Sequence, residues 1–167
     1  MALFFLYSRS RTILKVVLFL ALSKLKRMKK SGPIIVIEDD LEDQQLLDEI
    51  FKNLNFPNKV IFFSDGIDAV NYLIATEDLP FLILSDINMP RMDGFEVRNQ
   101  IISHQRLKCI PYLFFTTGVD KKAVFEAYEM SVQGFFIKPA RMMEMQNTVK
   151  KIIDYWQECY APSQFNN

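Results

Sequence analysis

An aspartate that follows a run of apolar residues is the first candidate for chemistry in this chain. Residues 81–84 are apolar, Ser85 and Asp86 come next, and a turn with one proline and one glycine occupies residues 87–94. A continuous apolar run is typical of a strand that is buried on both faces of a parallel sheet. The carboxyl end of such a strand is where open α/β sheets hold their ligands. Asp86 is therefore a candidate nucleophile or ligand, although an aspartate at this point could also merely shape the turn.

Three further apolar runs end in polar side chains: Glu38 and Asp39 after residues 34–37, Thr116 after 112–115, and Lys138 after 134–137. Because the carboxyl ends of parallel strands share one edge, we expect these groups to meet Asp86 in one crevice. Carboxylates gathered in this way repel one another unless a cation binds. Oxygen ligands without His or Cys favour Mg²⁺, which readily takes phosphate as a further ligand. With an ammonium and a hydroxyl for the phosphoryl oxygens, the set predicts phosphoryl transfer onto Asp86.

The apolar pattern predicts that alternating strands and helices carry these residues. Strands are predicted at 34–37, 60–63, 81–85, 112–115 and 134–137, and helices at 41–55, 66–75, 94–103, 121–130 and 141–156. Asp40 and Asp120 are the expected N-caps of two of these helices. The alternation predicts an α/β protein with a doubly wound, five-stranded parallel sheet.

Length and charge limit the number of domains and the kinds of partner. The 167 residues suit one domain with a substantial core, which we expect to span 33–157 and to be followed by a C-terminal tail, 158–167. Residues 1–32 hold eight of the 20 basic residues and no acid, so the other 12 face 20 acids and leave a net charge of −8. Such an acidic body argues against nucleic acid as a partner.

Cys109 and Cys159 lack metal or redox spacing, so we expect reduced thiols in a cytoplasmic protein.

The basic, apolar N-terminal segment, residues 1–32, differs from the rest of the chain. Its longer apolar run, 13–22, is shorter than the roughly 20 residues that a membrane-spanning helix needs, and its charge order does not suit a signal peptide. Three interpretations stay open: an amphipathic helix on a membrane surface, a tail that packs on the domain or a partner, or an untranslated stretch with Met28 as the start. We favour the last, because Met28 leads almost directly into the first predicted strand, and we expect no membrane partner.

Taken in order, these motifs resemble the receiver domain of bacterial two-component response regulators, of the CheY-like, stand-alone type. The resemblance covers about residues 33–157 and rests on the acidic pair, the Asp86-x-x-Met-Pro-x-Met-Asp-Gly run, Thr116 and Lys138-Pro139. It implies a flavodoxin-like (βα)5 fold. It also implies that Asp86 accepts a phosphoryl group from a histidine kinase or a phosphotransfer protein.

The resemblance assigns roles to individual residues. Mg²⁺ would be bound by the side chains of Asp39 and Asp86, by the backbone carbonyl of Asn88 and, through water, by Glu38. Thr116 and Phe135 would form the switch pair, and Lys138 would contact the acyl phosphate. Many receivers carry Tyr in place of Phe135, so any use of that hydroxyl is lost here. The Lys138–Pro139 bond is expected to be cis.

Three functions compete on this evidence. The first is a phosphoacceptor that binds a target protein or a second copy through the face of the fourth helix, fifth strand and fifth helix. The second is a degenerate receiver that acts as a constitutive docking module. The third is a phosphatase of the haloacid-dehalogenase type, which needs an acid two residues after the nucleophile, where this chain has Asn88. We therefore expect a signalling domain, not an enzyme.

Overall fold

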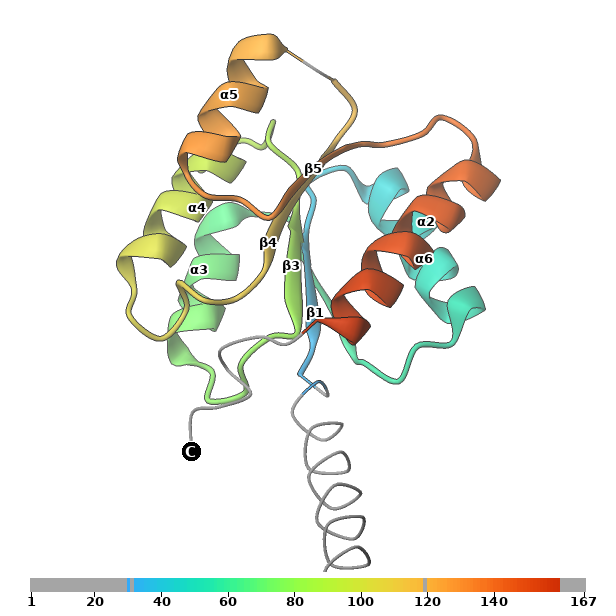
Figure 1. Cartoon of the computed structure of the whole chain (residues 1–167), viewed down its shortest axis with the longest axis horizontal. Helices are drawn as coiled ribbons and strands as arrows, with labels where there is room; N and C mark the ends of the chain where they lie inside the picture. Colours follow the sequence, from blue (N-terminus) through green and yellow to red (C-terminus); the bar gives the residue numbers. More distant parts are fainter. Residues whose placement is uncertain (1–29, 31, 119, 160–167) are drawn as a thin grey trace, which may run out of the picture. The chain divides into compact units, whose positions relative to one another are not determined.

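The described residues of a computed structural model, 30, 32–118 and 120–159, are built around one five-stranded sheet (Figure 1). The strands are β1 (Ile34–Ile37), β2 (Val60–Phe63), β3 (Leu82–Ser85), β4 (Tyr112–Thr116) and β5 (Gly134–Ile137). Their order is β2-β1-β3-β4-β5, and every neighbouring pair is parallel. The predicted doubly wound α/β fold is confirmed. The predictions for the N-terminal segment up to residue 29, and for the tail from Tyr160 onward, lie outside the described residues.

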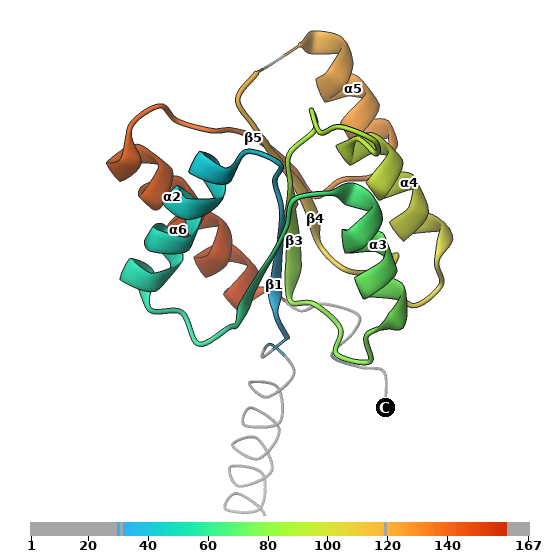
Figure 2. The same cartoon turned by 180° about the vertical axis from the view of Figure 1, so that it is seen from behind.

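Helices cover both faces of the sheet, as Figures 1 and 2 show from opposite sides. They are α2 (Leu41–Leu54), α3 (Gly66–Ala75), α4 (Gly94–Ser103), α5 (Lys121–Glu129) and α6 (Met142–Glu158). One apolar core lies between the sheet and α2 and α6, and a second lies under α3, α4 and α5. Because both faces are covered, every residue of β1, β3 and β4 is buried, which explains their uninterrupted apolar runs. Within the part of the chain described here, no helix has the length and apolar character to cross a bilayer.

The strand register brings the predicted functional residues to the same edge. Ile37, the last residue of β1, pairs with Ser85, the last residue of β3. The ladder continues one step further, since the Asp86 N–H donates to the Ile37 carbonyl over 2.8 Å. Toward the β5 edge of the sheet, the Lys138 N–H donates to the Thr116 carbonyl over 2.7 Å. The residues that follow β1, β3, β4 and β5 therefore lie along one rim.

Aspartate caps begin the helices that leave this rim. Asp40 accepts hydrogen bonds from two backbone N–H groups of α2, and Asp120 accepts one at the start of α5, as predicted. Asp93 caps α4 in a reciprocal capping box with Glu96. Most predicted bounds hold within one residue. The largest difference is at α6, which ends at Glu158, two residues beyond the prediction.

Two arginines tie helix ends to their neighbours. Arg98 of α4 donates from Nε to the Met130 carbonyl (3.1 Å) and from Nη2 to the Ser131 carbonyl (2.8 Å), at the end of α5. Arg106 donates to carbonyls at the end of α3, among them that of Ile74 (2.8 Å). The last carbonyls of a helix lack partners inside the helix, so these contacts satisfy polar groups that would otherwise be costly to cover.

Candidate functional site

Asp86 lies at the centre of the rim, directly after β3, and only 7% of its surface is exposed. Its Oδ1 accepts the Ile87 N–H over 2.6 Å and lies 3.4 Å from the Asn88 nitrogen. Its Oδ2 lies 3.1 Å from Lys138 Nζ. The backbone and one ammonium thus orient a carboxylate that is nearly buried, as a nucleophile or a ligand requires.

Glu38 and Asp39, which follow β1, complete an acidic cluster with Asp86. One carboxylate oxygen from each of the three residues lies within 4.8 Å of the other two. Glu38 is 2% exposed, and burial raises the pKa of its carboxyl to about 7, although the hydrogen bond and positive charge of Lys138 oppose this shift. Asp39 is half-buried. Three oxygen donors in so small a volume suit a divalent cation such as Mg²⁺, which would relieve their mutual repulsion.

Lys138, after β5, reaches across the rim into this cluster. Its Nζ forms ion pairs with Glu38, with Asp43 (Oδ2, 2.8 Å) and with Asp86. Burial alone would lower the pKa of Lys138, but the hydrogen bonds to Asp43 and Glu38 outweigh it and raise the pKa. Lys138 therefore carries a positive charge beside Asp86, where a phosphoryl oxygen would need one.

Asp43 is the member of this group that sequence reasoning missed. It lies in the first turn of α2 and is not part of any strand end. A signal was available, since a helix that begins at the rim turns its first residues toward neighbouring strand ends. The partner could not be inferred, because Lys138 is 95 residues further along the chain.

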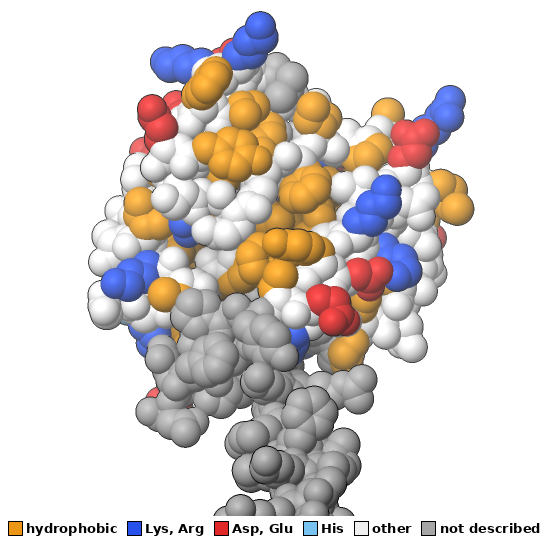
Figure 3. Space-filling model, in the orientation of Figure 1, with side chains coloured by type: hydrophobic (Ala, Val, Ile, Leu, Met, Phe, Trp, Pro, Cys, Tyr) orange, Lys and Arg blue, Asp and Glu red, His pale blue; other side chains and the backbone are white. Residues whose placement is uncertain are grey.

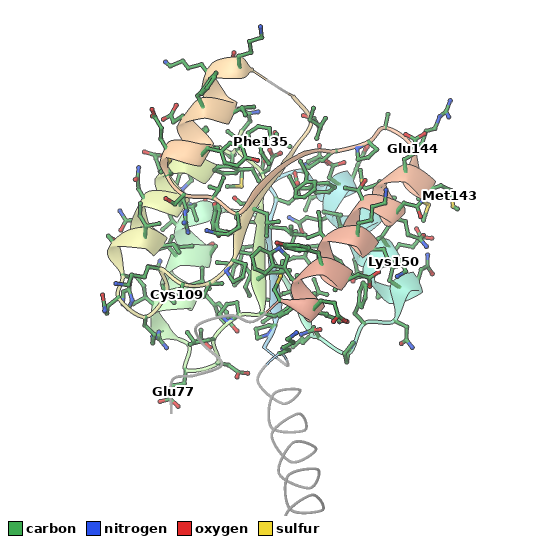
Figure 4. All side chains as sticks on the ribbon, in the orientation of Figure 1. Glu77, Cys109, Phe135, Met143, Glu144 and Lys150 are labelled. Atoms are coloured by element: carbon green, nitrogen blue, oxygen red, sulfur yellow. The ribbon has the colours of Figure 1, made fainter. Side chains whose placement is uncertain are left out.

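Thr116 and Phe135, the predicted switch pair, lie on adjacent strands but not at the same depth. Thr116 ends β4 and is fully buried, and its Oγ1 has no hydrogen-bond partner among the residues that the structure describes. Phe135 lies deeper on β5, with its half-buried ring edge-on to Phe114 at 6.0 Å, on the α5 side of the sheet (Figure 4). The orphaned hydroxyl suits an incoming phosphoryl oxygen, since a buried donor without a partner is costly.

The rest of the rim is open toward Asn88, which is exposed. Asn88, Gly118 and Asp120 are among the residues that line a pocket of about 760 Å³ between the β3–α4 and β4–α5 connections. His104 follows α4 and is half-buried, at the opposite end of that helix from the rim, and it plays no part in the site.

The expectation of a cis Lys138–Pro139 bond is wrong for this structure. No cis peptide bond occurs within residues 32–118 and 120–159, so this bond is trans. The trans isomer is generally favoured by about 0.5–1 kcal/mol even before proline. Lys138 reaches the acidic cluster with the bond in this form.

The fold and the site define a class: a doubly wound α/β protein with an acidic, cation-suited cluster around a strand-end aspartate. The model of the response regulator receiver domain family matches residues 34–150. The chain belongs to this family, which functions in two-component signalling.

Individual relatives support the same assignment. A probable methanogenesis regulatory protein, FilR2, from Methanothrix harundinacea is 32% identical over 74% of this chain and 82% of its own length. Response regulator Rcp1 from Synechocystis is 30% identical over 75% of this chain and 88% of its own. Among solved structures, the phosphorylated cyanobacterial phytochrome response regulator RcpA superposes with a TM-score of 0.73 at 31% identity. That match covers 78% of this chain and 98% of RcpA.

Proposed function

We propose that this chain is a phosphoacceptor whose Asp86 receives a phosphoryl group from a histidine kinase or a phosphotransfer protein, with Mg²⁺ as cofactor. One observation carries the proposal: the Asp86 carboxylate lies between an acidic cluster suited to a cation and the ammonium of Lys138. Two relatives agree with it, since RcpA was solved phosphorylated and Rcp1 was solved with Mn²⁺ bound. A histidine kinase or phosphotransfer donor also implies a cytoplasmic location.

In the proposed reaction, an Asp86 carboxylate oxygen attacks the phosphorus atom of a phosphohistidine. The new O–P bond forms as the P–N bond breaks, and the imidazole leaves with the electron pair of that bond. Lys138 balances the charge on one phosphoryl oxygen, and the Thr116 hydroxyl donates to another. Asp39 and Asp86 would hold Mg²⁺ through their side chains, Asn88 through its backbone carbonyl and Glu38 through water. The ion would neutralise charge that develops on the phosphoryl group.

We further propose that the chain is a signalling domain and not an enzyme. Asn88 cannot act as the general acid that a phosphatase of the haloacid-dehalogenase type needs at this position. The signal would leave through a protein surface, because the acidic body disfavours nucleic acid.

The surface that we propose for binding a partner is formed by the fourth and fifth of the five described helices, α5 and α6, and by β5. This surface, called the α5–β5–α6 face, carries several exposed apolar side chains. Phe125 and Tyr128 on α5 are 73% and 57% exposed, Ile137 on β5 is 49% exposed, and Tyr155 on α6 is 63% exposed. Figure 3 shows apolar side chains gathered over these elements. Exposed aromatic residues of this kind are enriched in protein interfaces. The occupant would be a target protein or a second copy of the chain.

The direct test is phosphorylation with acetyl phosphate and Mg²⁺, followed by intact-mass measurement. Wild-type protein should gain the mass of one phosphoryl group, and Asp86→Asn should gain none because its amide is a poor nucleophile. Asp93→Asn is the matched control, since Asn also caps helices well and Asp93 lies outside the cluster. A wild-type protein that stays unmodified while folded would favour the degenerate docking module. Modification of Asp86→Asn at the wild-type rate would refute the assignment of the acceptor.

A further inference from the structure

Asp43, in the first turn of α2, contacts Lys138. Its Oδ2 lies 2.8 Å from Lys138 Nζ. The N-cap of α2 helps to fix this arrangement, because Asp40 Oδ1 accepts the Asp43 N–H over 3.1 Å. The contact thus joins the first turn of α2 to the end of β5.

The hydrogen-bonding capacity of Lys138 is fully used in this arrangement. An ammonium has three N–H donors and no acceptor. Three carboxylates take them: Glu38, Asp43 at 2.8 Å and Asp86 at 3.1 Å. A phosphoryl oxygen on Asp86 can therefore accept a hydrogen bond from Lys138 only if one of these three carboxylates loses its hydrogen bond to Lys138.

Asp86, whose contact with Lys138 is the longest at 3.1 Å, can pass its own N–H donor to the phosphoryl group that it carries, so any further donor must come from Glu38 or Asp43. Exposure decides which of these two can be released at the lower cost. The Glu38 side chain is 2% exposed and that of Asp43 is 28% exposed. Release of Glu38 would leave a buried carboxylate without its counter-charge, which is strongly unfavourable. A released Asp43 carboxylate can be hydrated instead.

We infer that Asp43 is a positioning residue, which holds Lys138 in the unphosphorylated protein and competes with the phosphoryl group for one of its N–H donors. This inference rests on the proposed role of Asp86 as the phosphoacceptor. Loss of the Asp43 charge then favours the phosphorylated state through Lys138, beyond the general effect of removing one negative charge near an anion.

The first test measures binding of the phosphoryl mimic beryllofluoride at saturating Mg²⁺. Asp43→Asn should bind the mimic about fivefold more tightly than wild type, the size expected for residues that share one ion-pair network. Asp40→Asn is the matched control. It removes the same charge from the same helix end, but Asp40 caps α2 through backbone N–H groups, and Asn caps equally well. Asp40→Asn should change the affinity less than Asp43→Asn does, and equal shifts in the two variants would overturn the inference.

A second readout detects the contact without any phosphoryl chemistry. In the unliganded protein the ¹⁵N resonance of the Lys138 ammonium should shift or broaden in Asp43→Asn and stay unchanged in Asp40→Asn. A resonance that responds alike in both variants would contradict a specific tether. If wild-type protein binds no beryllofluoride, the proposed function is refuted, and so is the proposed competition between Asp43 and the phosphoryl group for Lys138. If wild type binds the mimic and Asp43→Asn binds it equally well, only the role of Asp43 is refuted.

Discussion

Asp39 and Asp86 belong to the same acidic cluster, but the fold supports them differently. Asp86 accepts the Ile87 N–H and lies beside Lys138, so its removal would also break these favourable contacts. Asp39 is half-buried in the cluster and follows β1 without being part of the strand. It is therefore the better probe of repulsion among the carboxylates.

We expect Asp39→Asn to stabilise the metal-free protein by about 1 kcal/mol. Two like charges at ~4 Å repel by roughly 1 kcal/mol in water and more in a protein interior, and the partial exposure of Asp39 favours the lower value. Mg²⁺ should stabilise wild type by mass action and the variant less, because one anionic ligand is lost. Thermal unfolding in chelator and in Mg²⁺ measures both effects.

The control for this prediction is Asp48→Asn on α2. Asp48 is paired with exposed Lys52 outside the cluster, so its loss should leave the response to Mg²⁺ unchanged. A lower melting temperature for Asp39→Asn in chelator, with the control unaffected, would count against the clustering argument.

Among the five described helices, α5 has the fewest buried residues. Ala127 is its only buried residue. Its C-terminal end is held by Arg98, which is 1% exposed, donates to the Met130 and Ser131 carbonyls and lies 5.4 Å from the Tyr112 ring centroid. Its N-terminal end follows Thr116 by a short connection at the rim. The helix is thus anchored at the end that lies away from the candidate site.

We predict that Arg98→Lys lowers the free energy of unfolding by about 1–3 kcal/mol and loosens α5 in particular. A lysine keeps the charge but cannot reproduce the two diverging hydrogen bonds of the guanidinium, so buried carbonyls lose their partners. Chemical denaturation measures the stability, and amide hydrogen exchange over residues 121–132 measures the local effect.

Arg106→Lys is the matched control, because Arg106 makes the equivalent contacts at the end of α3. It should speed exchange in α3 and not in α5. Exchange that rises equally in all helices of Arg98→Lys would show that the arginine supports the whole domain and does not anchor α5 specifically.

In the molecule as a whole, β5 belongs to the α5–β5–α6 face and also leads into the site at Lys138, and β4, which ends in Thr116, pairs with it. Within the described part of the chain the Thr116 hydroxyl, at the rim, has no hydrogen-bond partner, and the Phe135 ring lies against Phe114 further along the sheet. A phosphoryl group that accepts a hydrogen bond from Thr116 would favour one arrangement of Thr116 and Phe135. It would thereby shift the population of conformations of the α5–β5–α6 face.

We therefore predict that the phosphoryl mimic beryllofluoride, with Mg²⁺, promotes association through this face. Sedimentation should show self-association or tighter binding of a target protein, and amide exchange should show protection on α5 and α6. Phe125→Ser and Tyr155→Ser should weaken the association, since both side chains are largely exposed apolar groups on the face.

Ile74→Ser is the control for this pair, because Ile74 is also exposed (47%) but lies on α3, outside the face. It should associate like wild type. If the mimic binds and neither association nor protection on α5 and α6 changes, the proposed output surface is wrong.

Local sequence patterns predict the order of strands and helices along the chain, two of the helix caps and the residues that lie together at the rim. These features are local: apolar runs define buried strands, aspartates such as Asp40 begin helices, and parallel strands end at one edge. The position of the acidic pair, Asp86, Thr116 and Lys138 at one edge therefore follows from local patterns alone.

Which of these groups touch, and which other residue joins them, depends on contacts between residues that are far apart in the sequence. The ion pairs of Lys138 with Asp43 and Glu38 span 95 and 100 residues of sequence, and Arg98 reaches carbonyls 32 and 33 residues away. The trans Lys138–Pro139 bond likewise went against expectation. Such contacts depend on strand register and on how helices pack across the sheet, which local patterns of residues do not encode.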